Sequence, residues 1–246
     1  MASKGCSTDM SSLIFSTLRN ELIELVIKPG EEIQESSVCE RFDVTRPPVR
    51  TAFQRLSDIG LVEVKPYIGV FATLINLDKI YQIIHLRTVV ESQVLRDFID
   101  SKPDDFILEE LDHNIRLQKL LIAQPKINQA EFFQQDSSLH QFWFKQQRCL
   151  DIWNLIQSQE TEYTRFRMLD FVVTQKYTDI VADHEKLVEA IAKGDGSIVE
   201  SILGTHLNNG LQRFGDKIFT EYSLYFVPPK DTGYWREYNK RYHRTW

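Results

Sequence analysis

Four side chains in the second half of the sequence are of the types that bind divalent metal ions. They are one carboxylate and three imidazoles: Asp136, His140, His184 and His206. Asp136 and His140 are four residues apart, a spacing that stacks two side chains on one face of a helix. Imidazole and carboxylate donors suit Zn²⁺, Ni²⁺ or another first-row divalent ion. These four residues are therefore the predicted ligands of a metal site.

The last two predicted helices bring two of these histidines level with each other. Helical periodicity covers residues 177–193 and 197–214, and the turn signal Gly194-Asp195-Gly196 joins the two patterns. His184 lies ten positions before Gly194 and His206 ten positions after Gly196, so an antiparallel pair aligns the two imidazoles. A single inward-facing histidine is more often a core residue than a ligand. Four inward-facing groups of ligand type favour a metal site instead.

Other helical patterns precede this pair and predict an all-α bundle. They cover about residues 104–122, 129–145 and 150–171, after a first helix that ends near Ile99. The pattern over 129–145 places Asp136 and His140 on one face with three aromatic residues, Phe132, Trp143 and Phe144. An ionised carboxylate among aromatic side chains is costly unless something compensates its charge.

Arg87 and Glu91 lie in the middle of the apolar arc of that first helix. Because they are four residues apart they can form a buried ion pair that fixes helix packing. Alternatively, the guanidinium of Arg87 presents two parallel donors to the carboxylate of a small ligand. Arg87 is therefore a candidate ligand-binding residue, and both interpretations stay open at this point.

The first 75 residues predict a winged helix-turn-helix. Helical stretches cover residues 13–27 and 35–42, and a third begins after Thr45 and ends at Gly60. The tight turn Asp43-Val44 before the third helix is typical of helix-turn-helix modules. Two β-prone runs, residues 61–64 and 70–73, follow and predict a hairpin that forms the wing.

The third helix has the division of faces that a recognition helix needs. One arc is apolar and carries Val49, Ala52, Phe53, Leu56 and Ile59, and the opposite arc carries Arg46, Pro47, Arg50, Thr51 and Gln54. Guanidinium and amide groups on such an arc can meet phosphates and guanine edges in the major groove. Simple solvation of an exposed helix face is the alternative. From Arg41 to Arg55, however, four arginines stand against one acid in a chain of net charge −6, which favours a local DNA contact.

A family resemblance rests on four strings in this region. They are Lys28-Pro29-Gly30-Glu31, Val44-Thr45-Arg46-Pro47-Pro48-Val49-Arg50, Gln54-Arg55-Leu56 and Gly60-Leu61-Val62. The region resembles the winged-helix domain of GntR-type bacterial transcription regulators, which implies that Thr45, Arg46 and Arg50 contact operator DNA. The wing glycine of the family is retained as Gly69, where it allows close approach to a minor groove. Ser36 and Ile68 depart from the family pattern, so two further contacts are not carried over.

The second half is similar to the all-helical ligand-binding domain of FadR-type regulators, the FCD domain. The similarity rests on Asp136-Ser137-Ser138-Leu139-His140, Asp183-His184-Glu185, Gly194-Asp195 and His206-Leu207. It implies that the four predicted ligands hold the metal ion, and that the arginine of the opening helix lies near a ligand pocket. The resemblance covers about residues 13–215.

Composition sets the remaining expectations. The 246 residues are 42% hydrophobic, have few glycines and prolines, and contain no apolar run of the roughly 20 residues that span a bilayer. Three cysteines, widely spaced, fit a reducing compartment, so we expect a cytoplasmic protein with no membrane partner. We expect a mostly α fold with three parts: a winged helix-turn-helix over 1–75, an all-helical domain over 76–221, and an aromatic, basic tail over 222–246. The tail would pack on its own domain or a partner subunit, or contact nucleic acid.

Together these features predict a DNA-binding transcription regulator, most simply a repressor. It would bind double-stranded operator DNA as a homodimer, since two-fold symmetry calls for paired half-sites. A small carboxylate effector would bind in the helical domain beside a divalent metal, zinc or nickel. One alternative is a metal-dependent enzyme of the hydrolase type, although the sequence shows no nucleophile motif or phosphate-binding glycine loop. The other is a regulator whose metal is purely structural.

Overall fold

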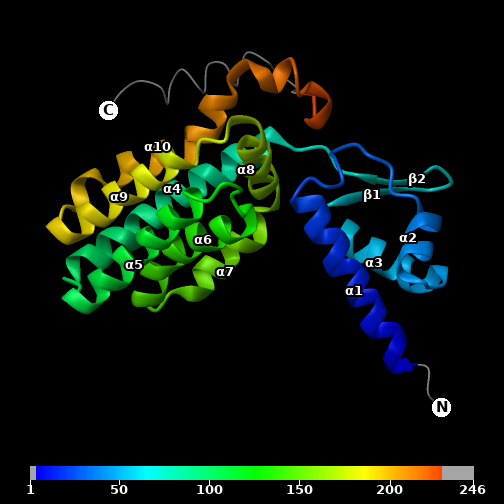
Figure 1. Cartoon of the computed structure of the whole chain (residues 1–246), viewed down its shortest axis with the longest axis horizontal. Helices are drawn as coiled ribbons and strands as arrows, with labels where there is room; N and C mark the ends of the chain where they lie inside the picture. The colour runs from blue at the N-terminus through cyan, green and yellow to red at the C-terminus, as the bar shows by residue number, and fades with distance from the viewer. Residues whose placement is uncertain (1–3, 229–246) are drawn as a thin grey trace. The chain divides into compact units, whose positions relative to one another are not determined.

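The computed structural model describes residues 4–228, with side chains from Met10 onward. Contacts between Cα atoms divide the chain into two units. The first contains the chain up to Leu77, the segment Thr164–Leu169 and the described residues from Asp216 onward. The second contains Asp78–Tyr163 and Asp170–Gly215. Figure 1 shows that helices dominate both units, as the sequence predicts, and that the only sheet drawn is a short hairpin.

The first unit is a winged helix-turn-helix. Its elements are α1 (Lys4–Ile23), α2 (Glu35–Phe42), α3 (Arg46–Asp58), β1 (Val62–Lys65) and β2 (Gly69–Ala72). The strands pair antiparallel, with Val62 opposite Ala72 and Lys65 opposite Gly69. One core joins the helices to the hairpin, and its fully buried members are Ile14, Leu22, Val49, Ala52, Leu56 and Leu61. This core fixes α3 from behind and leaves its other face in solvent.

Two helix ends in this unit differ from the sequence prediction. α1 ends at Ile23 rather than residue 27, because Leu25 takes a left-handed conformation (φ 59°) and Ile27 N–H closes the helix end by donating to Glu21 O. α3 ends at Asp58, so Ile59 leaves the predicted apolar arc and is 43% exposed. The other four residues of that arc are buried.

The second unit is a bundle of helices. Its elements are α4 (Leu77–Asp100), α5 (Asp105–Ile122), α6 (Gln129–Gln146), α7 (Leu150–Gln159), the two ends of α8 (Thr161–Thr174), α9 (Tyr177–Lys193) and α10 (Val199–Phe214). Side chains cap two of them: Asp104 accepts from Ile107 N–H and Asn128 from Glu131 N–H. Gly194, with φ 69°, ends α9, and α10 then packs against it (Figure 1).

One predicted helix is two. The pattern over residues 150–171 is broken at Glu160, between α7 and α8, without any proline or glycine. The Glu160 carboxylate accepts hydrogen bonds from Gln157 Nε2 at 2.5 Å and from Arg87 Nη1 at 3.3 Å. A contact with a residue 73 positions away therefore accompanies the break, and no local sequence signal reports it.

Part of the predicted tail belongs to the described chain. Ile75 and Phe226 form a parallel bridge, in which Ile75 N–H donates to Tyr225 O and Val227 N–H donates to Ile75 O. The basic residues of the tail lie outside the described residues. Among the helices described, none is both long and apolar enough to cross a membrane.

Candidate functional site

The four predicted metal ligands come together inside the second unit. α6 supplies Asp136 and His140, α9 supplies His184 and α10 supplies His206. All four are buried, and one donor atom from each lies within 4.8 Å of the others. The Nε2 atom of His206 is 3.3 Å from Nε2 of both His140 and His184, and Asp136 Oδ1 is 3.5 Å from His184 Nε2. Three helices thus direct their donors at one point.

The outer nitrogens of two histidines show which form the rings take. His140 Nδ1 lies 2.6 Å from Glu91 Oε2, and His184 Nδ1 lies 2.7 Å from Gln118 Oε1. Both oxygens accept, so both Nδ1 atoms carry a proton, and in the neutral form of each ring the lone pair is on Nε2, which faces inward. A single N–H of His206 can satisfy at most one of these lone pairs, and Asp136 adds negative charge. The donor set therefore fits a cation at the centre.

Glu91 connects the candidate metal site to a buried arginine. Burial raises the pKa of Glu91, but the charge of Arg87 and the hydrogen bond from His140 outweigh burial and lower this pKa to about 2. The carboxylate is therefore ionised, with one oxygen 2.5 Å from Arg87 Nε and the other on His140. The sequence suggests the pair with Arg87 from its spacing but not the second contact with His140.

Arg87 is held on several sides. Besides Glu91, its Nη1 is 3.3 Å from Glu160 Oε2, and its guanidinium lies over the rings of Trp153 and Tyr163. Burial lowers the pKa of Arg87, and the charges of Glu91 and Glu160 more than offset that effect and raise it. The buried ion pair offered by the sequence is thus present. The role of Arg87 in ligand binding stays a prediction.

His206 has an acid behind it as well. Its Nδ1 lies 3.9 Å from Asp183 Oδ2, which also accepts a hydrogen bond from Asn209 at 2.7 Å. Lys186 neutralises Asp183 at 2.8 Å. Each inward histidine therefore has an oxygen on its outer side: His140 and His184 are oriented by hydrogen bonds, and His206 by a more distant carboxylate.

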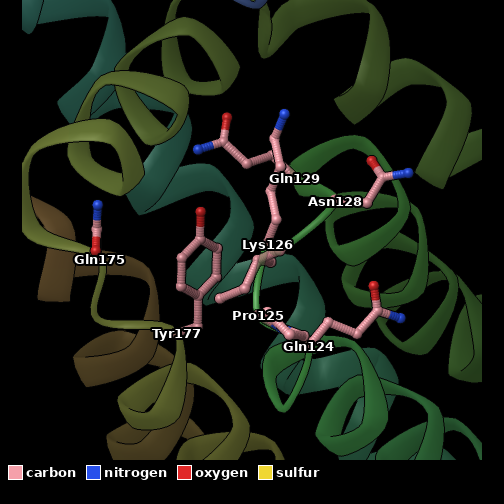
Figure 2. Close-up of a pocket in the computed structure, with 8 residues that line it drawn as sticks. Gln124, Pro125, Lys126, Asn128, Gln129, Gln175 and Tyr177 are labelled. Atoms are coloured by element: carbon pink, nitrogen blue, oxygen red, sulfur yellow. The ribbon is translucent and has the colours of Figure 1, made fainter.

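A polar cavity of about 830 Å³ lies at the ends of α6 and α9 where their chains enter the bundle. Figure 2 shows its side chains on two facing segments; the residues are Gln124, Pro125, Lys126, Ile127, Asn128 and Gln129 on one and Gln175 and Tyr177 on the other. The buried Tyr177 ring stacks on Phe171 and meets Phe132 edge-on. Phe132 is one helical turn from Asp136, so these aromatic contacts connect the lining of the cavity to the helix that carries two of the predicted ligands.

The predicted DNA-contacting residues of α3 lie on its open face. Thr45, Arg46, Arg50, Thr51 and Gln54 are all exposed. Thr45 occupies the N-cap position but makes no side-chain cap hydrogen bond, so its hydroxyl is not committed to the helix end. Gln54 donates to Asp58 and Thr51 donates to the Pro47 carbonyl. The arrangement presents two guanidiniums and short polar groups on one solvent face.

Glu35, the first residue of α2, pairs with both arginines. Its carboxylate is 3.1 Å from Arg50 Nε and 3.5 Å from Arg46 Nε. The pattern of α3 alone does not predict this contact, because Glu35 lies on the preceding helix. The Glu35 carboxylate holds both arginine side chains on the exposed face of α3 and places a negative charge beside them.

The wing is built around Gly69. A Cβ at this position would lie 3.1 Å from Glu32 Oε1 and 3.3 Å from the Phe71 ring, so the strand fits best without a side chain. Tyr67 and Ile68 at the tip are fully and 70% exposed. Gly69 itself is half-buried, and the exposed tip beside it is the part of the hairpin that can reach a groove.

Comparison with known proteins supports both halves. Residues 11–71 match the family described as bacterial regulatory proteins, gntR family, and residues 82–209 match the FCD domain. The HTH-type transcriptional repressor RspR of Escherichia coli K12 is 27% identical over 198 residues, which cover 79% of this chain and 84% of RspR. A transcriptional regulator from an unstable DNA locus of Streptomyces ambofaciens is 26% identical over 194 residues, 79% of this chain and 80% of that protein.

Solved structures share the fold. A GntR transcriptional regulator from Rhodococcus sp. RHA1 aligns with a TM-score of 0.64 at 22% identity, covering 82% of this chain and 96% of that one. E. coli McbR/YncC aligns with the same TM-score at 12% identity, covering 87% of this chain and 98% of that one. The chain therefore belongs to the GntR family of bacterial regulatory proteins, in the group that carries an FCD domain, and is a DNA-binding transcription regulator.

Proposed function

We propose that this regulator is a metal-containing repressor whose hold on operator DNA changes when a small carboxylate effector binds its FCD domain. The convergence of four buried donors from three helices carries the proposal. The FCD resemblance supports the same ligand set: Asp136, His140, His184 and His206. Zinc or nickel suits three imidazoles and one carboxylate. When bound, the ion supplies a positive centre for the donors and a Lewis-acid position for an effector carboxylate.

The proposed function needs two copies of the DNA-binding unit, one from each subunit. We propose a homodimer that reads a two-fold symmetric operator in the cytoplasm, with α3 of each subunit in a major groove and the wing at Gly69 near the backbone or minor groove. The exposed Thr45, Arg46, Arg50, Thr51 and Gln54 support this docking. Repression is the sign suggested by the name of RspR. An effector regulates only if its affinity differs between DNA-bound and free forms.

Replacing Glu35 tests how the recognition face is tuned. Glu35→Gln removes the charge that pairs with Arg50 and Arg46 and that repels phosphate. We expect non-specific DNA affinity to rise by about two- to thirtyfold in the dimer, since we assign the exposed Glu35 carboxylate about 0.2–1 kcal/mol in each of two subunits. Fluorescence anisotropy with a duplex of unrelated sequence measures it. Glu109→Gln, on α5 in the other unit, is the matched control, and equal affinity of both variants would contradict the role of Glu35.

The amide-lined cavity is the proposed effector site. Its volume of about 830 Å³ suits a small organic acid, and Lys126 with four amide side chains offers the donors that a carboxylate needs. Arg87 is not among the residues that line this cavity. Its predicted contact with an effector carboxylate is therefore a separate one, in which the effector would displace Glu160 from Arg87.

A thermal-shift screen of carboxylic acids checks this site. A hit should raise the melting temperature of the metal-loaded protein in proportion to log concentration. The shift should shrink in Lys126→Met and persist in Lys145→Met, an exposed lysine at the other end of α6. A hit that stabilises both variants equally would move the effector away from this cavity.

The alternatives differ in what metal removal does. Metal removal would abolish turnover in an enzyme and the response to the effector in a sensor. If the ion is purely structural, its removal would lower only the thermal stability. We infer that the chain is not an enzyme, because the relatives it matches are transcription regulators. Retention of the effector response after complete removal of the metal would leave the ion a purely structural role.

A further inference from the structure

A chain of amide hydrogen bonds leads from the metal centre to the half-exposed groove between α5 and α6. His184 Nδ1 lies 2.7 Å from Gln118 Oε1, and Gln118 Nε2 donates to Asn114 Oδ1 at 2.7 Å. Asn114 Nδ2 in turn donates to the backbone carbonyl of Gln135 at 3.1 Å and to its side-chain Oε1 at 3.3 Å. Gln118 is fully buried, whereas Asn114 is half-buried and lines the groove.

The backbone carbonyl of Gln135 determines the direction of each bond in this chain, because a carbonyl oxygen can only accept. Asn114 must therefore turn its NH₂ group toward Gln135, which leaves its oxygen facing Gln118. Gln118 then turns its own NH₂ group toward that oxygen and its oxygen toward His184. His184 Nδ1 must donate, so the lone pair of the ring is on Nε2, where it faces the other three ligands.

We propose that Gln118 and Asn114 are positioning residues that hold His184 in the one tautomer able to bind the metal through Nε2. This inference rests on the proposed metal-containing function. A free neutral imidazole exchanges its proton between two nitrogens. The amide chain holds the proton of His184 on Nδ1 before a metal ion binds. Because Gln118 is neutral, it does so without adding a further charge to a region that already contains the carboxylates of Glu91 and Asp183.

The interior position of Gln118 supports a positioning role rather than a packing role. A fully buried amide costs free energy unless every polar atom finds a partner, and an apolar side chain would fill the same space without that requirement. Here both amide atoms are satisfied, and α5 packs directly against α6 and α9, which carry three of the four ligands. Gln118 is therefore placed where its oxygen accepts from His184 and its NH₂ group is held by Asn114.

Gln118→Met tests the relay directly, since methionine has a similar length but neither accepts nor donates strongly. The zinc dissociation constant, measured by competition with a chromogenic chelator, should rise by about ten- to a hundredfold. In the ¹⁵N-labelled zinc form, the variant should also lose one slowly exchanging Nδ1–H resonance. Unchanged affinity with the resonance intact would overturn the relay, whereas wild-type protein that binds no metal would overturn the proposed function instead.

Two variants of Asn114 keep the test decisive if Gln118→Met folds poorly. Asn114→Asp retains an oxygen that accepts from Gln118, so affinity for zinc should stay close to that of wild type. Asn114→Leu removes this oxygen and frees Gln118 to rotate, so affinity should fall by about tenfold. Both variants lose the NH₂ group that donates to the Gln135 carbonyl, so their metal-free melting temperatures should fall together and the comparison between them isolates the oxygen. If the two bind zinc equally tightly, Asn114 does not orient Gln118 and the relay is wrong.

Discussion

His184→Ala should abolish stoichiometric metal binding and lower the melting temperature of the second unit. The side chain is fully buried, and its loss leaves two imidazoles and one carboxylate as the remaining ligands of the set. An ion at about a thousand times its dissociation constant stabilises a fold by about 4 kcal/mol. Because 1 kcal/mol moves the melting point of such a chain by about 2–4 °C, we expect a fall of about 8–16 °C.

Elemental analysis and calorimetry of the purified protein give the two readouts. His113→Ala is the control, because His113 is an exposed histidine on α5 outside the ligand set. It should keep both the metal and the melting temperature. Chelation of the wild-type protein should reproduce the fall in melting temperature seen for His184→Ala. Full metal occupancy in His184→Ala would remove this residue from the ligand set.

Arg50→Ala should weaken operator binding by about thirtyfold or more. A guanidinium that reads a guanine edge contributes about 1–3 kcal/mol, and a symmetric dimer loses two of them. Folding should be unaffected, since Arg50 is exposed and its pair with Glu35 lies at the surface. Operator affinity is measured by anisotropy at fixed salt, next to the melting temperature of each variant.

The variant Arg116→Ala separates the loss of a base contact from the loss of a positive charge. Arg116 is an exposed arginine of the second unit, so its removal changes net charge equally and should leave operator affinity near wild type. Arg50→Ala should also narrow the gap between operator and unrelated DNA, because a lost base contact relaxes specificity. An unchanged operator affinity in Arg50→Ala would remove α3 as the recognition helix.

Where local chemistry decides, the sequence is enough to predict the structure. α2 and α9 have the predicted bounds because a left-handed residue follows each, Asp43 with φ 51° and Gly194 with φ 69°. The convergence of the four ligands follows from helical periodicity plus one turn. In each case the controlling residues are near in the chain, so their spacing carries the information.

Contacts between distant residues are harder to predict. Gln118 lies 66 positions from His184, and Glu160 lies 73 from Arg87, so no periodicity reports either partnership. Glu35 is only 15 positions from Arg50 but belongs to a different helix. Amides and acids of this kind read in a sequence as ordinary polar residues, because their partners are set by packing angles between helices.

The burial of all four predicted ligands would determine when the protein acquires the proposed ion. Asp136 and His206 are far apart in the chain, yet both are enclosed when folding is complete, with at most 8% of either exposed. An ion enters or leaves such an enclosure only when helices separate, a rare opening with a large free-energy cost. Exchange of the proposed ion with solvent would then be slow, so chelation and competition experiments on the folded protein need long equilibration. An effector in the proposed site at Lys126, whose side chain is exposed, would instead bind and leave without such an opening.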